Sequence, residues 1–284
     1  MTTDKWASWL LHRRDAGDAA VKRDHHPTLI AFRDGVLARA RIEPGDVVLD
    51  VGTGTGLIGF GALERVGDGG RVIFSDVSEA LLDECRRQAA GDARCSFVPA
   101  SAEDLGEVPD ASVDVVTTRS VLMYVADRER AFGELARVLR PGGRLSIFEP
   151  INSFAGERFG FLGYDLTPVL PMVAKVLTAY EAEDVITEFD ERDLLRWAAG
   201  AGFTAIEMDY RAEMDVTAPP LPGDWTALRD TAPNPLAPTY REAMEATLTE
   251  NEREHLESHI REAMESGTPR RTTMATAYLR AVRA

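Results

Sequence analysis

The sequence has little cysteine and no long hydrophobic run. Its 284 residues include two cysteines, Cys85 and Cys95, which give neither a disulfide framework nor a metal-ligand spacing. Two such thiols fit a reducing compartment. No apolar run approaches the roughly 20 residues that span a bilayer, and the apolar patch Trp6–Leu11 is too short for a signal peptide. We therefore expect a cytoplasmic protein with no metal site and no membrane partner.

Positive charge is also scarce. The net charge is −15, and no block of lysine and arginine stands out. Proteins that bind nucleic acid usually present a basic face, so nucleic acid is excluded as an expected partner. The acidity itself is explained by solubility. The apolar fraction of 44% is ordinary for a globular protein, and the length suits one large α/β domain with insertions or two small domains.

Short apolar runs alternate with helical segments along much of the chain. Residues 47–51 are apolar at nearly every position, which favours a strand buried on both faces of a parallel sheet. Strands alternating with helices predict right-handed crossovers. The predicted strands are 47–51, 71–75, 95–99, 113–117, 144–148, 203–210 and 272–282. The predicted helices are 78–90, 127–139 (ended by Pro141-Gly142-Gly143), 191–201 and 240–266.

The same pattern predicts how the chain is divided. We expect a helical N-terminal cover over residues 1–45 and a ligand-binding α/β core over 46–150. Residues 151–190 form a predicted insertion or lid, and 191–284 the C-terminal part of the core, interrupted by a helical insertion at about 217–268. Long connections inside a compact domain are often functional lids. The aromatic residues of the first insertion would either line a substrate wall or pack the lid; they are Phe154, Phe159, Phe161, Tyr164 and Tyr180.

Glycines follow the first predicted strand at positions 52, 54 and 56. They allow a tight turn and let a ligand approach the backbone at the carboxyl edge of the sheet. About twenty residues after Gly56, Asp76 ends the second strand, where a carboxylate can accept both hydroxyls of an adenosine ribose.

Two cofactors suit this loop, NAD and S-adenosylmethionine (SAM). Residues 54–59 (GTGLIG) match the dinucleotide pattern G-x-G-x-x-G, so the local pattern leaves both open, as well as a purely structural turn. The first glycine, however, is Gly52, and Asp50 lies inside the strand two residues before it. SAM carries a methionine tail instead of a pyrophosphate, and Asp50 could complement the ammonium of that tail directly or through water.

Five segments resemble the class I SAM-dependent methyltransferases and occur in the order of that family. They are VLDVGTGTG (48–56), FSDVS (74–78), SAEDL (101–105), DVVTTRSVLMYV (114–125) and ELARVLRPGGRLSIFEP (134–150). The last weighs most against the rival class, a nicotinamide-dependent oxidoreductase. The resemblance implies a Rossmann-like α/β fold with a doubly wound, seven-stranded, mostly parallel sheet, a helical N-terminal segment and lid insertions. Its seventh strand would be antiparallel.

The resemblance also implies which residues bind SAM. They are Asp50, Gly52, Thr53, Gly54, Gly56, Asp76, Val77, Ala102, Glu103, Arg119 and Ser120. Asp76 would hold the ribose, with Val77 against the adenine. Glu103 would accept a hydrogen bond from the adenine amine, or it would cap a helix begun at Ser101. Arg119 and Ser120 would face the tail and the methyl group.

The implied reaction moves a methyl group from SAM to a small molecule and leaves S-adenosylhomocysteine. The enzyme mainly supplies alignment and desolvation, while an oxygen, nitrogen or carbon acceptor can also need a base. The catalytic candidates are Tyr124, His25 and Glu149, with His26 and Asp165 as further groups. Tyr124 would face the sulfonium through a cation–π contact or pack in the core. Glu149 would contact the substrate or form structural hydrogen bonds, and the histidines would act in catalysis or lie at the surface.

The expected partners are a small-molecule substrate and, as a homodimer, a second copy of the chain. A SAM-binding regulator without turnover is a further alternative, because the binding motifs are stronger than any catalytic motif.

Overall fold

The structure, a computed structural model, describes residues 4–155 and 161–284. The chain forms two compact units. The helical unit comprises residues 1–28, 154–184 and 212–274, and the sheet unit comprises residues 29–153, 185–211 and 275–284. The division of the chain predicted from the sequence stays a prediction. No helix in the described ranges is both long and apolar enough to cross a membrane.

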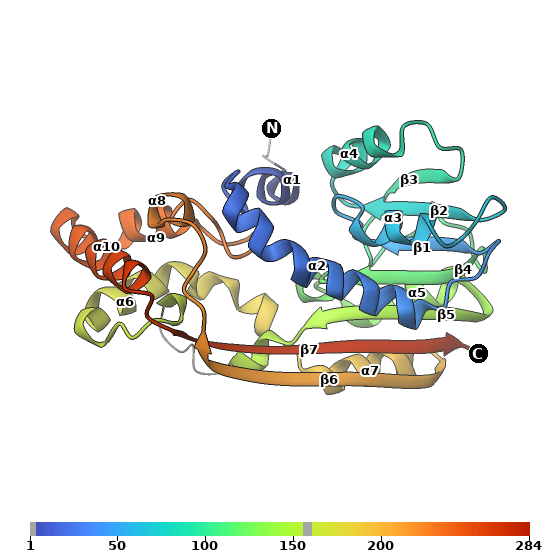
Figure 1. Cartoon of the computed structure of the whole chain (residues 1–284). Helices are drawn as coiled ribbons and strands as arrows, with labels where there is room; N and C mark the ends of the chain where they lie inside the picture. The colour runs from blue at the N-terminus through green and yellow to red at the C-terminus, as the bar shows by residue number, and fades with distance from the viewer. Residues whose placement is uncertain (1–3, 156–160) are drawn as a thin grey trace. The chain divides into compact units, whose positions relative to one another are not determined.

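The described strands form one sheet of seven strands (Figure 1). They are β1 Val47–Val51, β2 Arg71–Asp76, β3 Cys95–Pro99, β4 Val113–Arg119, β5 Leu139–Pro150, β6 Phe203–Ala218 and β7 Arg270–Arg283. Their order is β3-β2-β1-β4-β5-β7-β6. The pairs among β1 to β5 are parallel, whereas β7 runs antiparallel to β5. The predicted doubly wound, mostly parallel sheet is therefore confirmed.

The described α-helices have the following bounds. They are α1 Lys5–Ser8, α2 Ala19–Ala40, α3 Leu57–Leu63, α4 Glu79–Ala89, α5 Arg128–Val138, α6 Leu170–Leu177, α7 Glu191–Gly200, α8 Trp225–Leu228, α9 Tyr240–Thr247 and α10 Glu250–Glu265. Helical segments of other types are η1 Trp9–Arg13, η2 Leu122–Tyr124, η3 Asn152–Ala155, η4 Phe161–Gly163, η5 Thr167–Val169 and η6 Thr178–Thr187.

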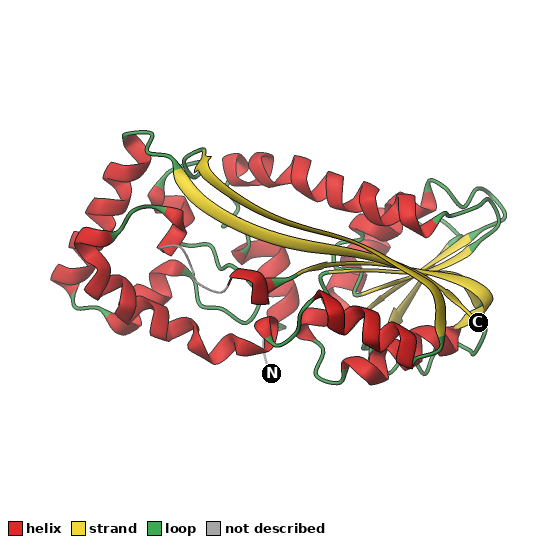
Figure 2. Ribbon diagram, turned by 90° about the horizontal axis from the view of Figure 1, so that it is seen from below, coloured by secondary structure: helices red, strands yellow, loops and turns green. Residues whose placement is uncertain are grey.

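Two apolar layers cover the two faces of the sheet in the sheet unit. One layer packs α5 and α7 against the strands through buried residues such as Phe132 and Leu194. The other packs α3, α4 and the end of α2 through Ile58, Leu82 and Val36. Figure 2 shows the helices on both sides of the twisted strands. Burying both faces explains why β1 is apolar at nearly every position.

The helical unit has an apolar core of its own. Its buried side chains come mainly from α6, α8, α9 and α10 and include Tyr164, Val176, Trp225, Met244 and Leu256. This cluster explains why these helices, which are short or highly charged, are stable here: each buries one apolar stripe against the others.

The largest departures from the predicted bounds are in the fifth and sixth strands. The helix predicted over 127–139 ends at Val138, one residue early, but the fifth strand begins at Leu139 instead of Arg144. Pro141-Gly142-Gly143 therefore lie inside β5, where the register with β4 shifts. The helical segment predicted over 240–266 consists of two helices, because Thr249 caps the start of α10 and the Glu252 side chain bonds back to it. The sixth strand continues beyond residue 210 to Ala218.

Candidate active site

The glycine loop leaves β1 at the point where the strand order reverses. In open α/β sheets, ligands bind at this position, outside the carboxyl ends of the strands. Gly52, Gly54 and Gly56 have φ angles of +66°, +58° and +86°. A Cβ atom on Gly56 would lie 2.4 Å from the Phe60 ring, so neither the backbone angle nor the space at that position suits a larger residue.

Asp50 holds this loop from inside the protein. Its Oδ2 accepts hydrogen bonds from Thr53 Oγ1 (2.7 Å) and the backbone N–H of Gly59 (3.0 Å). Its Oδ1 accepts from Thr117 Oγ1 on β4, at 2.8 Å. The side chain is only 1% exposed, and this burial raises the pKa of Asp50 to about 6. The structure thus ties the carboxylate to the loop, to α3 and to the neighbouring strand.

Asp76 joins the end of β2 to the same loop. Its Oδ2 accepts from the backbone N–H of Gly54, and its Oδ1 from that of Ser78, both at 2.9 Å. Ser78 in turn caps the start of α4, as predicted. The next residue, Val77, leaves 54% of its apolar surface exposed. The Asp76 carboxylate, held beside the partly exposed Gly54 backbone, suits the ribose of SAM. The exposed side chain of Val77 beside it suits the adenine.

The segment after β3 carries Ala102 and Glu103. Ala102 is buried. Ser101 pairs with Asp104 in an isolated bridge followed by a turn, so the alternative in which Glu103 caps a helix begun at Ser101 is wrong. Instead, Glu103 Oε1 accepts a hydrogen bond from the backbone N–H of Asp127, which caps the start of α5.

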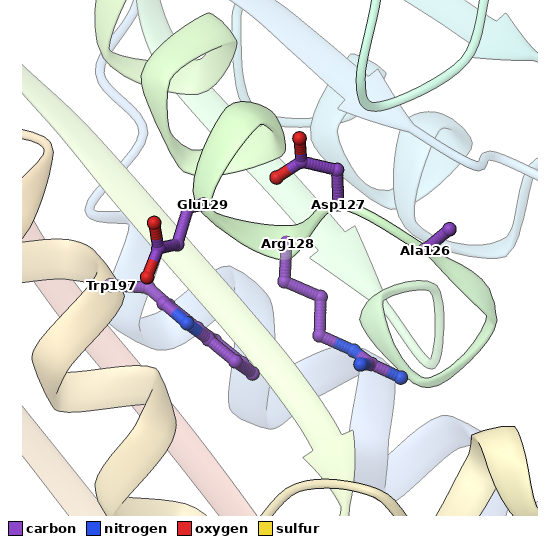
Figure 3. Close-up of a pocket in the computed structure, with 5 residues that line it drawn as sticks. All are labelled: Ala126, Asp127, Arg128, Glu129 and Trp197. Atoms are coloured by element: carbon purple, nitrogen blue, oxygen red, sulfur yellow. The ribbon is translucent and has the colours of Figure 1, made fainter.

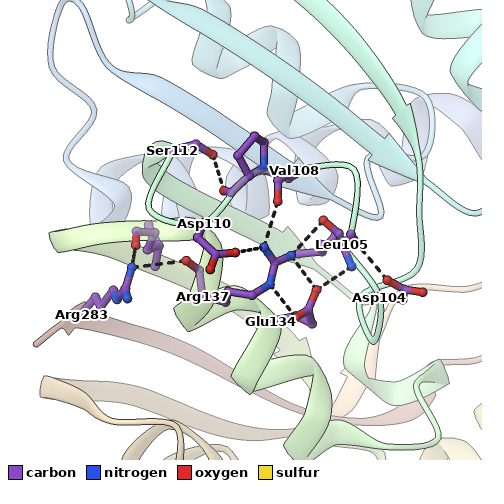
Figure 4. Close-up of polar contacts among 11 residues, drawn as sticks. Asp104, Leu105, Val108, Asp110, Ser112, Glu134, Arg137 and Arg283 are labelled. Carbon is purple, nitrogen blue, oxygen red and sulfur yellow. Dashed lines mark hydrogen bonds and ion pairs between the residues drawn. The ribbon is translucent and has the colours of Figure 1, made fainter.

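Two residues of α5 that the sequence analysis did not single out anchor this segment (Figure 4). The Arg137 guanidinium donates to the carbonyls of Leu105 and Val108, at 2.9 and 3.0 Å. Glu134 accepts from the backbone N–H of Leu105 and pairs with Arg137, which holds the pKa of Glu134 below its usual range. Both belong to the ELARVLRPGG segment, and their spacing of three residues on one helix was the available signal.

The chain turns sharply after β4. Ser120 has a φ of +56°, unusual for a residue with a side chain, and its N–H donates to the carbonyl of Phe148 on β5 (2.9 Å). The following Val121 side chain lies against Gly52. Arg119 and Tyr124, on either side of this turn, are both half-buried. The structure therefore brings Arg119 and Ser120 to the same edge of the sheet as the glycine loop.

Glu149 is fully buried at the end of β5. Its Oε1 accepts from the backbone N–H groups of Val121 and Leu122, at 2.8 and 2.9 Å. Burial is the main cause that raises the pKa of Glu149 to about 7, against these hydrogen bonds and the charge of Arg119. Glu149 was expected either to contact the substrate or to form structural hydrogen bonds, and the structure shows such hydrogen bonds.

The remaining candidates belong to the helical unit. His25 and His26 are exposed on α2. Asp165 is exposed and accepts hydrogen bonds from both the N–H and the hydroxyl of Thr167. Phe159 lies outside the described residues. Among residues 4–155 and 161–284, no three His, Cys, Asp or Glu side chains are grouped closely enough to hold a metal ion.

A pocket of about 470 Å³ lies beside the start of α5 (Figure 3). Its lining residues are Ala126, Asp127, Arg128, Glu129 and Trp197. None of them is a predicted cofactor residue. Arg128 is only 8% exposed, although it carries a charge.

The fold is a doubly wound α/β sheet with a glycine loop at its carboxyl edge, and comparisons with known proteins identify its family. Residues 49–147 match the methyltransferase domain family. The chain is 30% identical over 209 residues to the ubiquinone/menaquinone biosynthesis C-methyltransferase of Francisella tularensis subsp. novicida, covering 66% of this chain and 81% of that protein. It is 35% identical over 173 residues to the demethylmenaquinone methyltransferase of Clavibacter sepedonicus, covering 57% and 67%.

Solved structures agree with this family at the level of the fold. A geranyl diphosphate methyltransferase in complex with SAM superposes with a TM-score of 0.53 at 20% identity, covering 95% of this chain and 93% of that one. The chain belongs to the class I SAM-dependent methyltransferases. It is an enzyme that uses SAM to methylate a small molecule, and the rival classes of oxidoreductase and non-catalytic regulator are set aside.

Proposed function

We propose that SAM binds along the edge formed by the glycine loop, the end of β2, the segment 101–105 and the turn after β4. The observation that carries this proposal is the hydrogen bond between Asp76 Oδ2 and the Gly54 N–H, because it places the acidic group of β2 at the glycine loop. Asp76 holds the ribose, and Val77 and Ala102 border the adenine. The carbonyl and N–H groups of residues 52–56 meet the methionine tail, together with Arg119 and Ser120.

Asp50 acts mainly through the loop in this proposal. Its hydrogen bonds to Thr53, Gly59 and Thr117 keep the loop backbone in place, while its negative charge lowers the energy of a nearby ammonium. Glu103 keeps its predicted place beside the adenine. The predicted catalytic role of Tyr124 stays a prediction, as do that of His25, the homodimer and the cytoplasmic location.

We propose further that the acceptor is a ring carbon of a hydroquinone. One of the relatives described above is named a C-methyltransferase of ubiquinone and menaquinone biosynthesis, and the other is named a demethylmenaquinone methyltransferase. A ring carbon becomes a good nucleophile when a hydroxyl on the same ring is deprotonated, so the enzyme has to align the ring with the methyl group and exclude water.

Calorimetric titration tests the cofactor site. Micromolar binding of SAM and S-adenosylhomocysteine, with no binding of NADH, supports the proposal. Turnover is then measured with demethylmenaquinol and, as a comparison acceptor of a different class, with an aliphatic amine. Methylation of the amine alone would overturn the hydroquinone proposal and leave the cofactor site unaffected.

A further inference from the structure

Leu122 is held through its backbone by two buried ionisable side chains. Its N–H donates to Glu149 Oε1 at 2.9 Å, and its carbonyl accepts from Arg128 Nε at 3.0 Å. Glu149 is fully buried and Arg128 is 8% exposed. Burying either charge is costly unless it is well hydrogen-bonded, so packing alone gives no reason to place a carboxylate and a guanidinium here.

Arg128 is itself fixed on its other side. Its Nη1 donates to Glu188 at 3.2 Å, and its guanidinium lies 5.2 Å from the ring centre of Phe189 and 5.9 Å from that of Trp197. Figure 3 shows the Arg128 side chain extending from the start of α5 beside the pocket. The carbonyl of Phe189 accepts from Ser153 Oγ at 2.8 Å, so the surroundings of Arg128 are tied to the segment that follows β5.

The backbone that these groups hold is strained and adjoins the glycine loop. Ser120 has a φ of +56°, and Val121 packs against Gly52. A strained backbone conformation persists only where its surroundings over-determine it, and such residues cluster at functional sites. Glu149 binds the N–H groups of Val121 and Leu122, directly after the strained residue.

We propose that Glu149 and Arg128 are positioning residues for methyl transfer: they hold residues 120–122 so that Arg119, Ser120 and the glycine loop keep the arrangement that binds SAM. This inference rests on the proposed SAM site. Neither side chain touches the reacting atoms; each acts through the backbone of Leu122.

Four variants test the inference in the full chain. E149L removes the acceptor, whereas E149Q keeps an amide oxygen for the two N–H groups. R128K keeps the charge but lacks the planar guanidinium, whose Nε and Nη1 donate to the Leu122 carbonyl and to Glu188 at the same time. R144M is the matched control, because Arg144 also lies on β5 but pairs with Asp46, which precedes β1 at the opposite edge of the sheet.

The expected result is a KM for SAM at least fivefold higher in E149L and R128K, measured on the folded protein, with less change in kcat. E149Q restores the wild-type KM to within a factor of five, and R144M leaves it unchanged. If E149L does not fold, the KM values for SAM of R128K and E149Q test the inference. A change smaller than fivefold in R128K, or an equal rise in R144M, would overturn the inference. Failure of the wild-type protein to bind SAM would instead overturn the proposed site.

Discussion

A Cβ atom on Gly52 would lie 2.3 Å from Cγ2 of Val121, closer than two nonbonded carbon atoms approach. The end of β1 and the turn after β4 are therefore in direct contact at a position that only glycine allows. This contact joins the glycine loop to the residues that Glu149 and Arg128 hold.

The substitution G52A tests that contact. A left-handed backbone costs about 1–2 kcal/mol in a residue with a side chain, and the clash with Val121 adds to this cost. We expect lower stability and weaker SAM binding, measured by chemical denaturation and calorimetry. Gly142 supplies the control, because its φ is +77° but no atom lies within 4 Å of an added Cβ. G142A pays only the backbone cost, and SAM affinity as poor as that of G52A would contradict the role of the contact.

Asp76 provides the sharpest test of the cofactor site. In D76A the charged acceptor at the end of β2 is lost, which costs about 1.5–3 kcal/mol, or roughly 10- to 100-fold in SAM affinity. D76N is the matched variant, since it keeps the size of the side chain and one oxygen. Unchanged SAM affinity in folded D76A, measured by calorimetry, would show that the ribose lies elsewhere.

The buried carboxyl of Glu149 predicts a pH-dependent stability. Its pKa rises from 4.5 to about 7 in the folded protein. Because the folded state holds the proton more tightly than the unfolded state, Glu149 contributes stability that is fully present below pH 4.5. This contribution is lost as the pH rises through 7, and it amounts to about 3 kcal/mol in total. Glutamine does not titrate, so E149Q lacks this dependence.

Unfolding free energies of the wild-type protein and E149Q, compared at pH 4.5, 6 and 8, check this prediction. From pH 4.5 to pH 8, the unfolding free energy of the wild-type protein should fall relative to that of E149Q. Arg119 is the charged group whose proximity lowers the pKa of Glu149, so R119M should move the transition to higher pH. A difference between wild type and E149Q that stays constant with pH would refute the raised pKa.

Arg137 should stabilise the segment that borders the predicted adenine position. R137M removes the donors to the carbonyls of Leu105 and Val108, and we expect a loss of about 2 kcal/mol or more in unfolding free energy. Denaturation by urea measures this loss of unfolding free energy. Arg130, exposed on the same helix, provides the control: R130M should change stability by no more than about 0.5 kcal/mol. Equal losses in both variants would mean that the network contributes nothing specific.

Much of the candidate site could be predicted because it follows from local patterns. Gly52, Asp50 and Asp76 stand directly after or within short apolar runs, and parallel strands bring such positions to one edge. Arg128 could not be found in this way. Its partners Leu122, Glu188 and Phe189 lie up to 61 residues away, and nothing in the local pattern distinguishes it from Arg130, which is exposed on the same helix.

The sequence by itself determined the succession of strands and helices in the core, the glycine loop and the family, because period, turn residues and motif spacing are local properties of the chain. Only the tertiary structure decided that Glu149 binds the backbone of residues 121 and 122, that Arg128 holds the same backbone from the other side, and that Val121 fills the space beside Gly52. Hydrogen bonds to the backbone and close packing depend on where distant segments meet, and any side chain with a suitable donor, acceptor or shape satisfies them.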